Sequence, residues 1–153
     1  YTELDLSLPL DTEFFAAQFK DPAADDILCV SRKEKQVAIL NHQGDGLFEK
    51  LEVTKGISFG DNDQLLVGDT NGDGRSDLIA YTAETGIWRV FQNEGENRFQ
   101  PLDNDFGPWA QGLGRRGVVA DFDGNQKADI GSYDETAHVL DLALSYRGGT
   151  AVK

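Results

Sequence analysis

Residues 69–77 read Asp-Thr-Asn-Gly-Asp-Gly-Arg-Ser-Asp, and the apolar run Leu78-Ile79-Ala80 follows them directly. Counted from Asp69, side chains that carry oxygen stand at positions 1, 3, 5 and 9, and glycine stands at position 6. Calcium takes six to eight oxygen ligands, and a glycine lets the chain turn sharply around the ion. This stretch therefore predicts a calcium loop that leads into a β-strand.

A second copy of the stretch begins 52 residues later, at Asp121, and the apolar residue Ile130 follows it. Gln126 stands where glycine is expected, so we expect a strained, positive φ at a non-glycine residue. Asn125 replaces the carboxylate of Asp73, which leaves one less negative charge, and we therefore expect weaker binding in this loop. A long fixed period is typical of repeat architectures. The candidate ligands are Asp69, Asn71, Asp73, Asp77 and the backbone carbonyl of Arg75 in the first loop, and Asp121, Asp123, Asn125, Asp129 and the carbonyl of Lys127 in the second.

A third, degenerate copy precedes these two. Asp26 stands 51 residues before Asp77 and is followed by an apolar run. The ligand positions of this copy hold Gln18, Lys20 and Pro22, and neither lysine nor proline coordinates calcium. We expect no metal in this loop.

Each copy predicts four short strands separated by turns rich in Gly, Asp and Asn. Within residues 37–41 and 87–91, apolar side chains occur at both odd and even positions and so fall on both faces of a strand. This pattern is typical of strands that are covered on both faces. We therefore predict an all-β fold built from three four-stranded repeats of about 51 residues, each the blade of a β-propeller. The expected units are an outer strand within residues 1–12, a blade with a degenerate loop at 13–55, a blade with a strong calcium loop at 56–104, and a blade with a weaker loop at 105–153.

These repeats resemble the FG-GAP/VCBS family of calcium-binding β-propellers, which includes the integrin alpha-subunit propellers and many secreted bacterial proteins. The residues that carry the resemblance are Phe59-Gly60, residues 67–74, residues 77–79, Asn93, Gly95, Phe99 and Phe106-Gly107. The resemblance implies bound Ca²⁺, a secreted or cell-surface location, and a role in adhesion or carbohydrate binding. Similar propellers also occur in enzymes that degrade polysaccharides, so a catalytic or accessory role in such an enzyme is the alternative.

Other interpretations of the loops fit less well. An EF-hand needs a bidentate Glu at position 12, where this chain has Ala80 and Ser132. Paired dockerin loops lie closer together and lead into helices. Metal-free turns of Asp, Asn and Gly are common. Two copies at equivalent positions of the repeat argue against the interpretation that these loops are such turns.

Composition limits the possible partners. The chain has 153 residues and a formal net charge of −13, which disfavours nucleic acid and anionic membranes. No apolar run is long enough to cross a bilayer. The one cysteine, Cys29, excludes an internal disulfide, and its apolar neighbours predict a buried, inert thiol. The chain starts at Tyr1 and has no Met, as expected of a processed or excised piece.

No motif in the sequence requires catalysis, because there is no phosphate-binding glycine loop and no nucleophile elbow. The candidate recognition residues are Trp109, which lies in a turn-rich linker, and the following Arg115 and Arg116. An exposed Trp beside Arg suits a sugar ring or an acidic sugar. For Trp88 we expect packing inside the sheet stack.

Propellers usually close with four to eight blades, whereas this chain supplies three. We expect the chain to be part of a larger propeller, and the runner-up is a ring closed by several copies. An open three-blade arc is the least expected arrangement, because its end faces would expose apolar surface.

Overall fold

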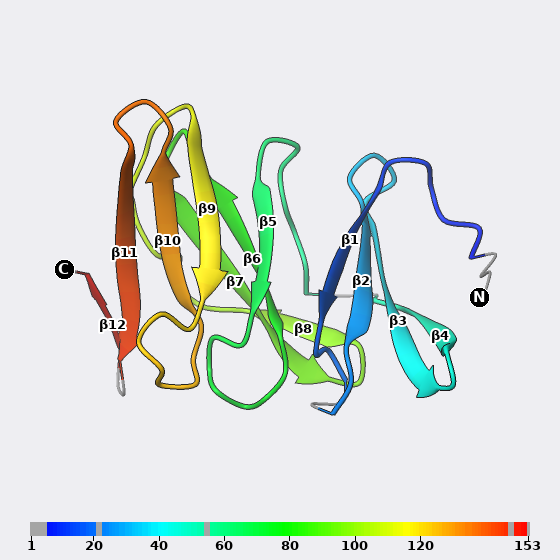
Figure 1. Cartoon of the computed structure of the whole chain (residues 1–153). Coiled ribbons are helices and arrows are strands. Elements are labelled where there is room, and N and C mark those ends of the chain that lie inside the picture. Colours follow the sequence, from blue (N-terminus) through cyan, green and yellow to red (C-terminus); the bar gives the residue numbers. More distant parts are fainter. Residues whose placement is uncertain (1–5, 21–22, 54–55, 147–148, 153) are drawn as a thin grey trace.

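The structure is a computed structural model, and it describes residues 6–20, 23–53, 56–146 and 149–152. This part of the chain is all-β and forms three four-stranded antiparallel sheets, each with its strands in sequence order (Figure 1). The described residues contain no helix, and hence none that is long and apolar enough to cross a membrane. The strands are β1 (Thr12–Ala17), β2 (Asp26–Ser31), β3 (Gln36–Gly44) and β4 (Leu47–Glu52); β5 (Gln64–Gly68), β6 (Asp77–Thr82), β7 (Ile87–Gly95) and β8 (Arg98–Pro101); β9 (Arg115–Ala120), β10 (Asp129–Asp134), β11 (Val139–Tyr146) and β12 (Gly149–Val152).

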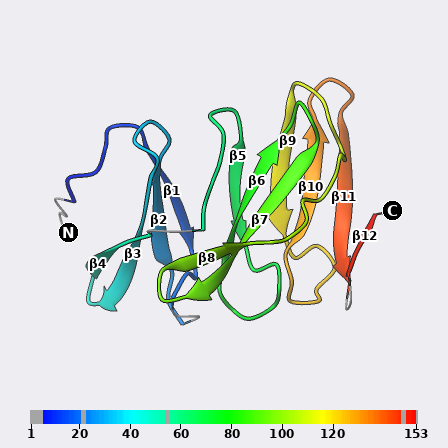
Figure 2. The same cartoon turned by 180° about the vertical axis from the view of Figure 1, so that it is seen from behind.

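The three sheets stand face to face in a row, which Figure 2 shows from behind. Their first strands, β1, β5 and β9, contact one another in turn along one side of the row. The first sheet, which begins with β1, and the third sheet, which ends with β12, lie at opposite ends of the row, and the described sheets do not close into a ring (Figure 1).

The middle sheet is buried on both faces, since it lies between the other two sheets. Successive side chains of a strand point to opposite faces, so one strand contributes to two cores. From β6, Leu78 and Ala80 pack against the first sheet, and Ile79 and Tyr81 pack against the third. Trp88 of β7 is 1% exposed and belongs to the second of these cores. The expectation of strands covered on both faces, and of a packing role for Trp88, is therefore confirmed.

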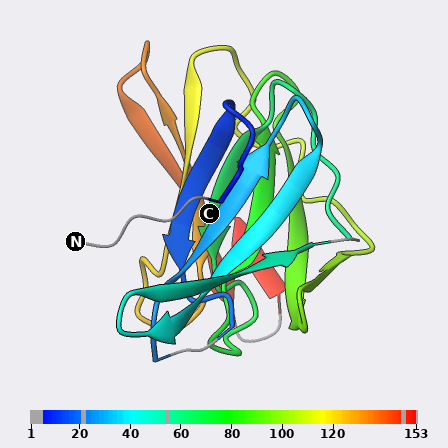
Figure 3. The same ribbon diagram turned by 90° about the vertical axis from the view of Figure 1, so that its right-hand side faces the viewer.

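The outward face of the first sheet is partly covered by the residues that precede β1. Leu6 and Leu8 pack there against Cys29, Ala38 and Leu40. Residues 1–5 of the expected outer strand within residues 1–12 lie outside the described residues, and Leu6 to Leu8 are not in a strand. Figure 3 shows this end of the row from the side.

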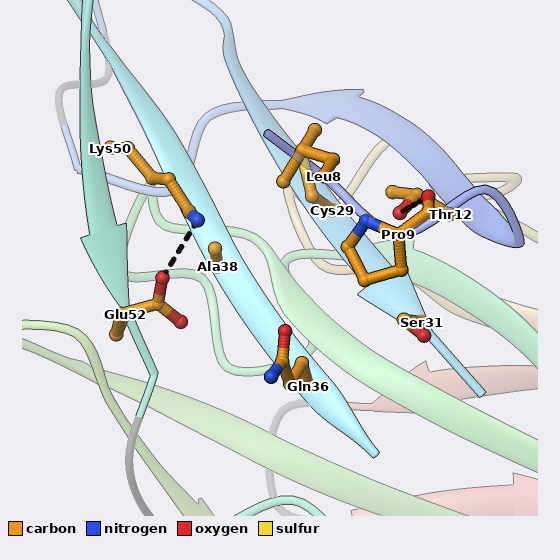
Figure 4. A pocket seen from close by; sticks show the side chains of 9 residues that line it. All are labelled: Leu8, Pro9, Thr12, Cys29, Ser31, Gln36, Ala38, Lys50 and Glu52. Atoms are coloured by element: carbon orange, nitrogen blue, oxygen red, sulfur yellow. Dashed lines mark hydrogen bonds and ion pairs between the residues drawn. The ribbon is translucent and has the colours of Figure 1, made fainter. Parts of the chain in front are cut away.

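The structure bears out the buried, inert thiol that the sequence predicts. Cys29 is 2% exposed, and burial raises the pKa of its thiol to about 11. Leu8 and Pro9 are among the residues that line a small hollow of about 10 Å³ beside Cys29, and Figure 4 shows these lining side chains. This space is at the lower limit for one water molecule, so it is a packing feature and not a ligand site.

The same backbone hydrogen bond joins each pair of neighbouring sheets. Ser76 N donates to Gln18 O, and Ala128 N donates to Asp69 O, both at 2.6 Å. In each pair the donor is position 8 of one loop and the acceptor is position 1 of the loop before it. The sheets are therefore related by a repeated interface as well as by a repeated sequence.

Candidate metal loops

Position 1 organises each of the two predicted calcium loops. Asp69 Oδ1 accepts from Gly72 N at 2.7 Å and from Asp73 N at 3.2 Å, and its Oδ2 accepts from Gly74 N at 2.7 Å. Asp121 accepts from the three equivalent amides at 2.7, 3.1 and 2.8 Å. One carboxylate thus holds the turn closed from inside in both loops.

Positions 3 and 5 continue the pattern, since each side-chain oxygen accepts from the backbone N–H two residues on. Asn71 accepts from Asp73 at 2.9 Å, and Asp73 accepts from Arg75 at 2.8 Å. In the other loop Asp123 accepts from Asn125 at 3.1 Å, and Asn125 accepts from Lys127 at 2.8 Å. The candidate ligand side chains of positions 1, 3 and 5 are therefore turned back into their own loops.

The backbone turns left-handed at positions 4 and 6 of both loops. Gly72 and Gly74 have φ of 81° and 84°, and Gly124 and Gln126 have φ of 77° and 69°. The sequence-based expectation that Gln126 adopts a positive φ is confirmed. Such a conformation costs a non-glycine residue about 1–2 kcal/mol, so the second loop carries strain that the first avoids.

Position 9 connects each loop to the third strand of its sheet. Asp77 Oδ2 accepts from Thr70 N at 2.9 Å, and its Oδ1 accepts from Asn93 N at 2.8 Å. Asp129 bonds to the amides of Phe122 and Ser145 in the same way, at 2.8 and 2.5 Å. Both aspartates are buried, at 0% and 1% exposure.

Asp26 makes similar bonds in the degenerate loop, where no metal is expected. It accepts from His42 N at 2.9 Å, as in the other loops, and from Lys20 N at 2.7 Å, one loop position later than the donors Thr70 and Phe122. Gln18 and Lys20 are exposed, and Pro22 lies outside the described residues. The closing aspartate is thus a structural element in all three sheets, whether or not a metal loop accompanies it.

The carboxylates are arranged differently in the two loops. In the described residues, the group of three acidic side chains with oxygens within 4.8 Å of one another is Asp121, Asp123 and Asp129. In the first loop, Asp73 Oδ2 lies 2.7 Å from Nη2 of Arg75. The side chain of Arg75, whose backbone carbonyl is a candidate ligand, therefore pairs with the candidate ligand Asp73.

The expected loss of one negative charge in the second loop is wrong. Asp123 stands where the first loop has Asn71, which offsets the exchange of Asp73 for Asn125, so each loop carries three carboxylates. Weaker binding in the second loop therefore rests on Gln126 alone.

One carboxylate in each loop has a shifted pKa, and the causes differ. Backbone hydrogen bonds, the first from Gln126, lower the pKa of Asp121 below its ordinary value, so this carboxylate ionises readily. Burial raises the pKa of Asp77. A bound cation would offset the cost of holding that buried carboxylate ionised. The donor set of each loop, three carboxylates with one amide and one backbone carbonyl, fits calcium.

The expected recognition residues are mostly engaged within the protein. Trp109 is half-buried, and its ring lies 5.9 Å from that of Trp88. Arg115 is paired with Asp141 at 2.7 Å and Asp134 at 3.3 Å, and its side chain is 15% exposed. Arg116 is more exposed and pairs with Glu135 at 2.5 Å.

Sequence reasoning missed a polar network on the middle sheet. Asp63 Oδ2 accepts from Gly60 N at 2.6 Å and pairs with Arg89 at 2.5 Å, and its Oδ1 accepts from Thr82 Oγ1 at 2.5 Å. The sequence does contain a signal for this network. The 52-residue repeat relates Asp63 to Arg115, so polar residues recur at equivalent positions of the two units.

Comparison with known protein families matches residues 69–132 to the FG-GAP-like repeat. The matched segment begins at the first residue of one candidate metal loop, spans β6 to β9, and includes the whole of the second loop. No curated protein matches the chain significantly. The sequence motif, the repeated hydrogen-bond pattern and this match agree that residues 69–132 are similar to the FG-GAP-like repeat.

Proposed function

We propose that this chain is a segment of a calcium-stabilised β-propeller that serves as an extracellular binding scaffold for a carbohydrate or protein ligand. The observation that carries the proposal is the shared geometry of residues 69–77 and 121–129. Both loops place oxygen-bearing side chains at the same four positions, around the same turns. The FG-GAP-like repeat supports the scaffold role.

In this proposal calcium has a structural role. The ion joins the carboxylates at the start of each loop to the closing aspartate, and so fixes the connection between the first two strands of a sheet. Extracellular calcium modules bind with Kd on the order of 10⁻⁴–10⁻³ M, which suits millimolar surroundings. Further sheets, from a longer chain or from other copies, would complete the ring.

Calcium should therefore raise the melting temperature, and a chelator should reverse the rise. With Kd in that range, 10 mM calcium stabilises the folded chain enough to raise Tm by about 3–10 °C. Differential scanning calorimetry, with and without calcium, measures this rise.

Variants locate the effect. Asp73→Ala should remove most of the rise in Tm, and Asp73→Ala with Asp123→Ala should abolish it. The exposed Asp103, which lies outside both loops, gives a matched control in Asp103→Ala. The quantity compared is the calcium-induced change in Tm, because Asp73→Ala also removes the ion pair with Arg75. An unchanged calcium response in the double variant would show that these loops are not the site.

A further inference from the structure

We propose that a cavity between the middle and third sheets binds a neutral saccharide of about two rings. This inference rests on the proposed scaffold function and gives it a ligand class and a site. The cavity has a volume of about 420 Å³ and lies between β7 and β11, under the linker that follows β8. Small-molecule sites commonly occupy about 300–1,000 Å³.

Of the twelve described residues that line the cavity, seven are apolar and five are polar. Trp88, Val90 and Phe106 line one side, and Ile130 and Ala143 line the other. Such walls suit the carbon faces of sugar rings, which pack on aromatic and aliphatic side chains.

Unused hydrogen-bonding groups surround these walls. Gln92, Asn104 and Asp105 line the cavity, and within the described residues their side chains make no hydrogen bond or ion pair. These amide and carboxylate groups are free to bond with ligand hydroxyls. Trp88 also lines the cavity, but its indole Nε1 is buried away from solvent and has no partner among the described residues.

The charge of the lining determines which sugars fit. Among the described lining residues there is no lysine or arginine, and Asp105 is the charged one. With a net charge of −13, the chain repels uronic acids and sulfated sugars from this site. Amide and hydroxyl groups both donate and accept hydrogen bonds, as required for neutral sugar hydroxyls.

A peptide strand fits this place less well. A peptide that binds by β-addition needs an unpaired strand edge. Both strands that wall the cavity are paired on either side, β7 with β6 and β8, and β11 with β10 and β12. The cavity therefore offers side chains and not a backbone edge.

Tryptophan fluorescence tests the site directly. The chain has two tryptophans, so Trp109→Phe leaves Trp88 as the reporter inside the cavity. This variant is titrated with maltose, cellobiose, xylobiose and galactobiose, and with digalacturonate as the anionic comparison. We expect a saturable change in emission with at least one neutral disaccharide at up to about 10 mM and none with digalacturonate.

Side-chain variants then assign the response. In the Trp109→Phe background, Gln92→Ala and Asn104→Ala should each weaken binding by about threefold to tenfold. Gln100→Ala is the matched control, because Gln100 is exposed on β8 and does not line the cavity. No saturable response to any of the neutral sugars, equal affinity in both cavity variants and the control, or tighter binding of digalacturonate would each overturn the proposal.

Repeating the titration with chelator separates this inference from the calcium proposal. A saccharide response in a chain whose Tm does not change with calcium supports the cavity and rejects the metal loops. A calcium-dependent Tm without any saccharide response does the reverse.

Discussion

At the residue scale, the closing aspartate of each loop has a role that does not depend on metal. Asp26, Asp77 and Asp129 each accept from one amide of their own loop and one amide 16 residues ahead. The degenerate loop retains Asp26 although its other ligand positions are lost. The carboxylate therefore serves first to hold the loop against the third strand of its sheet.

Asp26→Asn should lower the free energy of unfolding by about 2–3 kcal/mol, with or without calcium. The amide can accept one of the two backbone hydrogen bonds, but its NH₂ group then faces the other N–H donor. Urea denaturation in calcium and in chelator measures the loss. The exposed neighbour provides the control Asp25→Asn, which should change stability by less than about 0.5 kcal/mol. Recovery of the Asp26→Asn loss by calcium would contradict this metal-independent role.

At the element scale, the second and third sheets keep one cross-strand network with the charges reversed. In the middle sheet the network joins Asp63, which directly precedes β5, to Thr82 of β6 and Arg89 of β7. Exactly 52 residues on, Arg115 pairs with Asp134 and Asp141 in the third sheet. Each network lies at equivalent positions of its sheet. A charge pair is therefore present in both sheets, but the acidic and basic residues have exchanged places.

The Asp63→Ala variant should therefore be less stable than the double variant Asp63→Ala with Arg89→Leu. The single change leaves Arg89, whose side chain is 31% exposed, without its partner, whereas the double change removes both charges. We expect a coupling free energy of about 1 kcal/mol or more from a double-mutant cycle in urea. Arg116→Ala is the comparison for an exposed pair and should cost less than about 1 kcal/mol. Additive effects of Asp63→Ala and Arg89→Leu would show that the two side chains do not act as a pair.

At the scale of the whole molecule, the two end sheets differ in how their outward faces are covered. Leu6 and Leu8 pack on the outward face of the first sheet. The strand register places Val118, Gly131 and Leu142 side by side on the outward face of the third sheet, with Leu140 on the same face at 48% exposure. The middle sheet has similar apolar faces, and both of them are covered by a neighbouring sheet. Among the described residues, no further sheet covers the outward face of the third sheet.

We therefore expect the isolated chain to self-associate through the outward face of the third sheet. Size-exclusion chromatography with light scattering at about 10–100 µM should show species larger than a monomer, and Leu140→Glu should shift them toward the monomer. Leu47→Glu is the control, because Leu47 is also exposed, at 59%, but lies on β4 at the other end of the row. A well-folded chain that stays monomeric at 100 µM would exclude closure by copies of itself.

The sequence by itself determined the units of this protein and their local turns. The 51- and 52-residue spacing of Asp26, Asp77 and Asp129, together with the apolar runs after them, specified strands and loops because these depend on nearby residues. The left-handed turn at Gln126 was also predictable, since its place in the loop requires it.

Only the tertiary structure decided which side chains on different strands and sheets meet. It paired Arg115 with aspartates on β10 and β11, it left the indole N–H of Trp88 without a partner among the described residues, and it opened a cavity between the second and third sheets. These outcomes depend on how one sheet lies against the next and on which way each side chain turns. A repeat in the sequence fixes the spacing along the chain, but side-chain contacts follow from the packing of residues that are far apart in it.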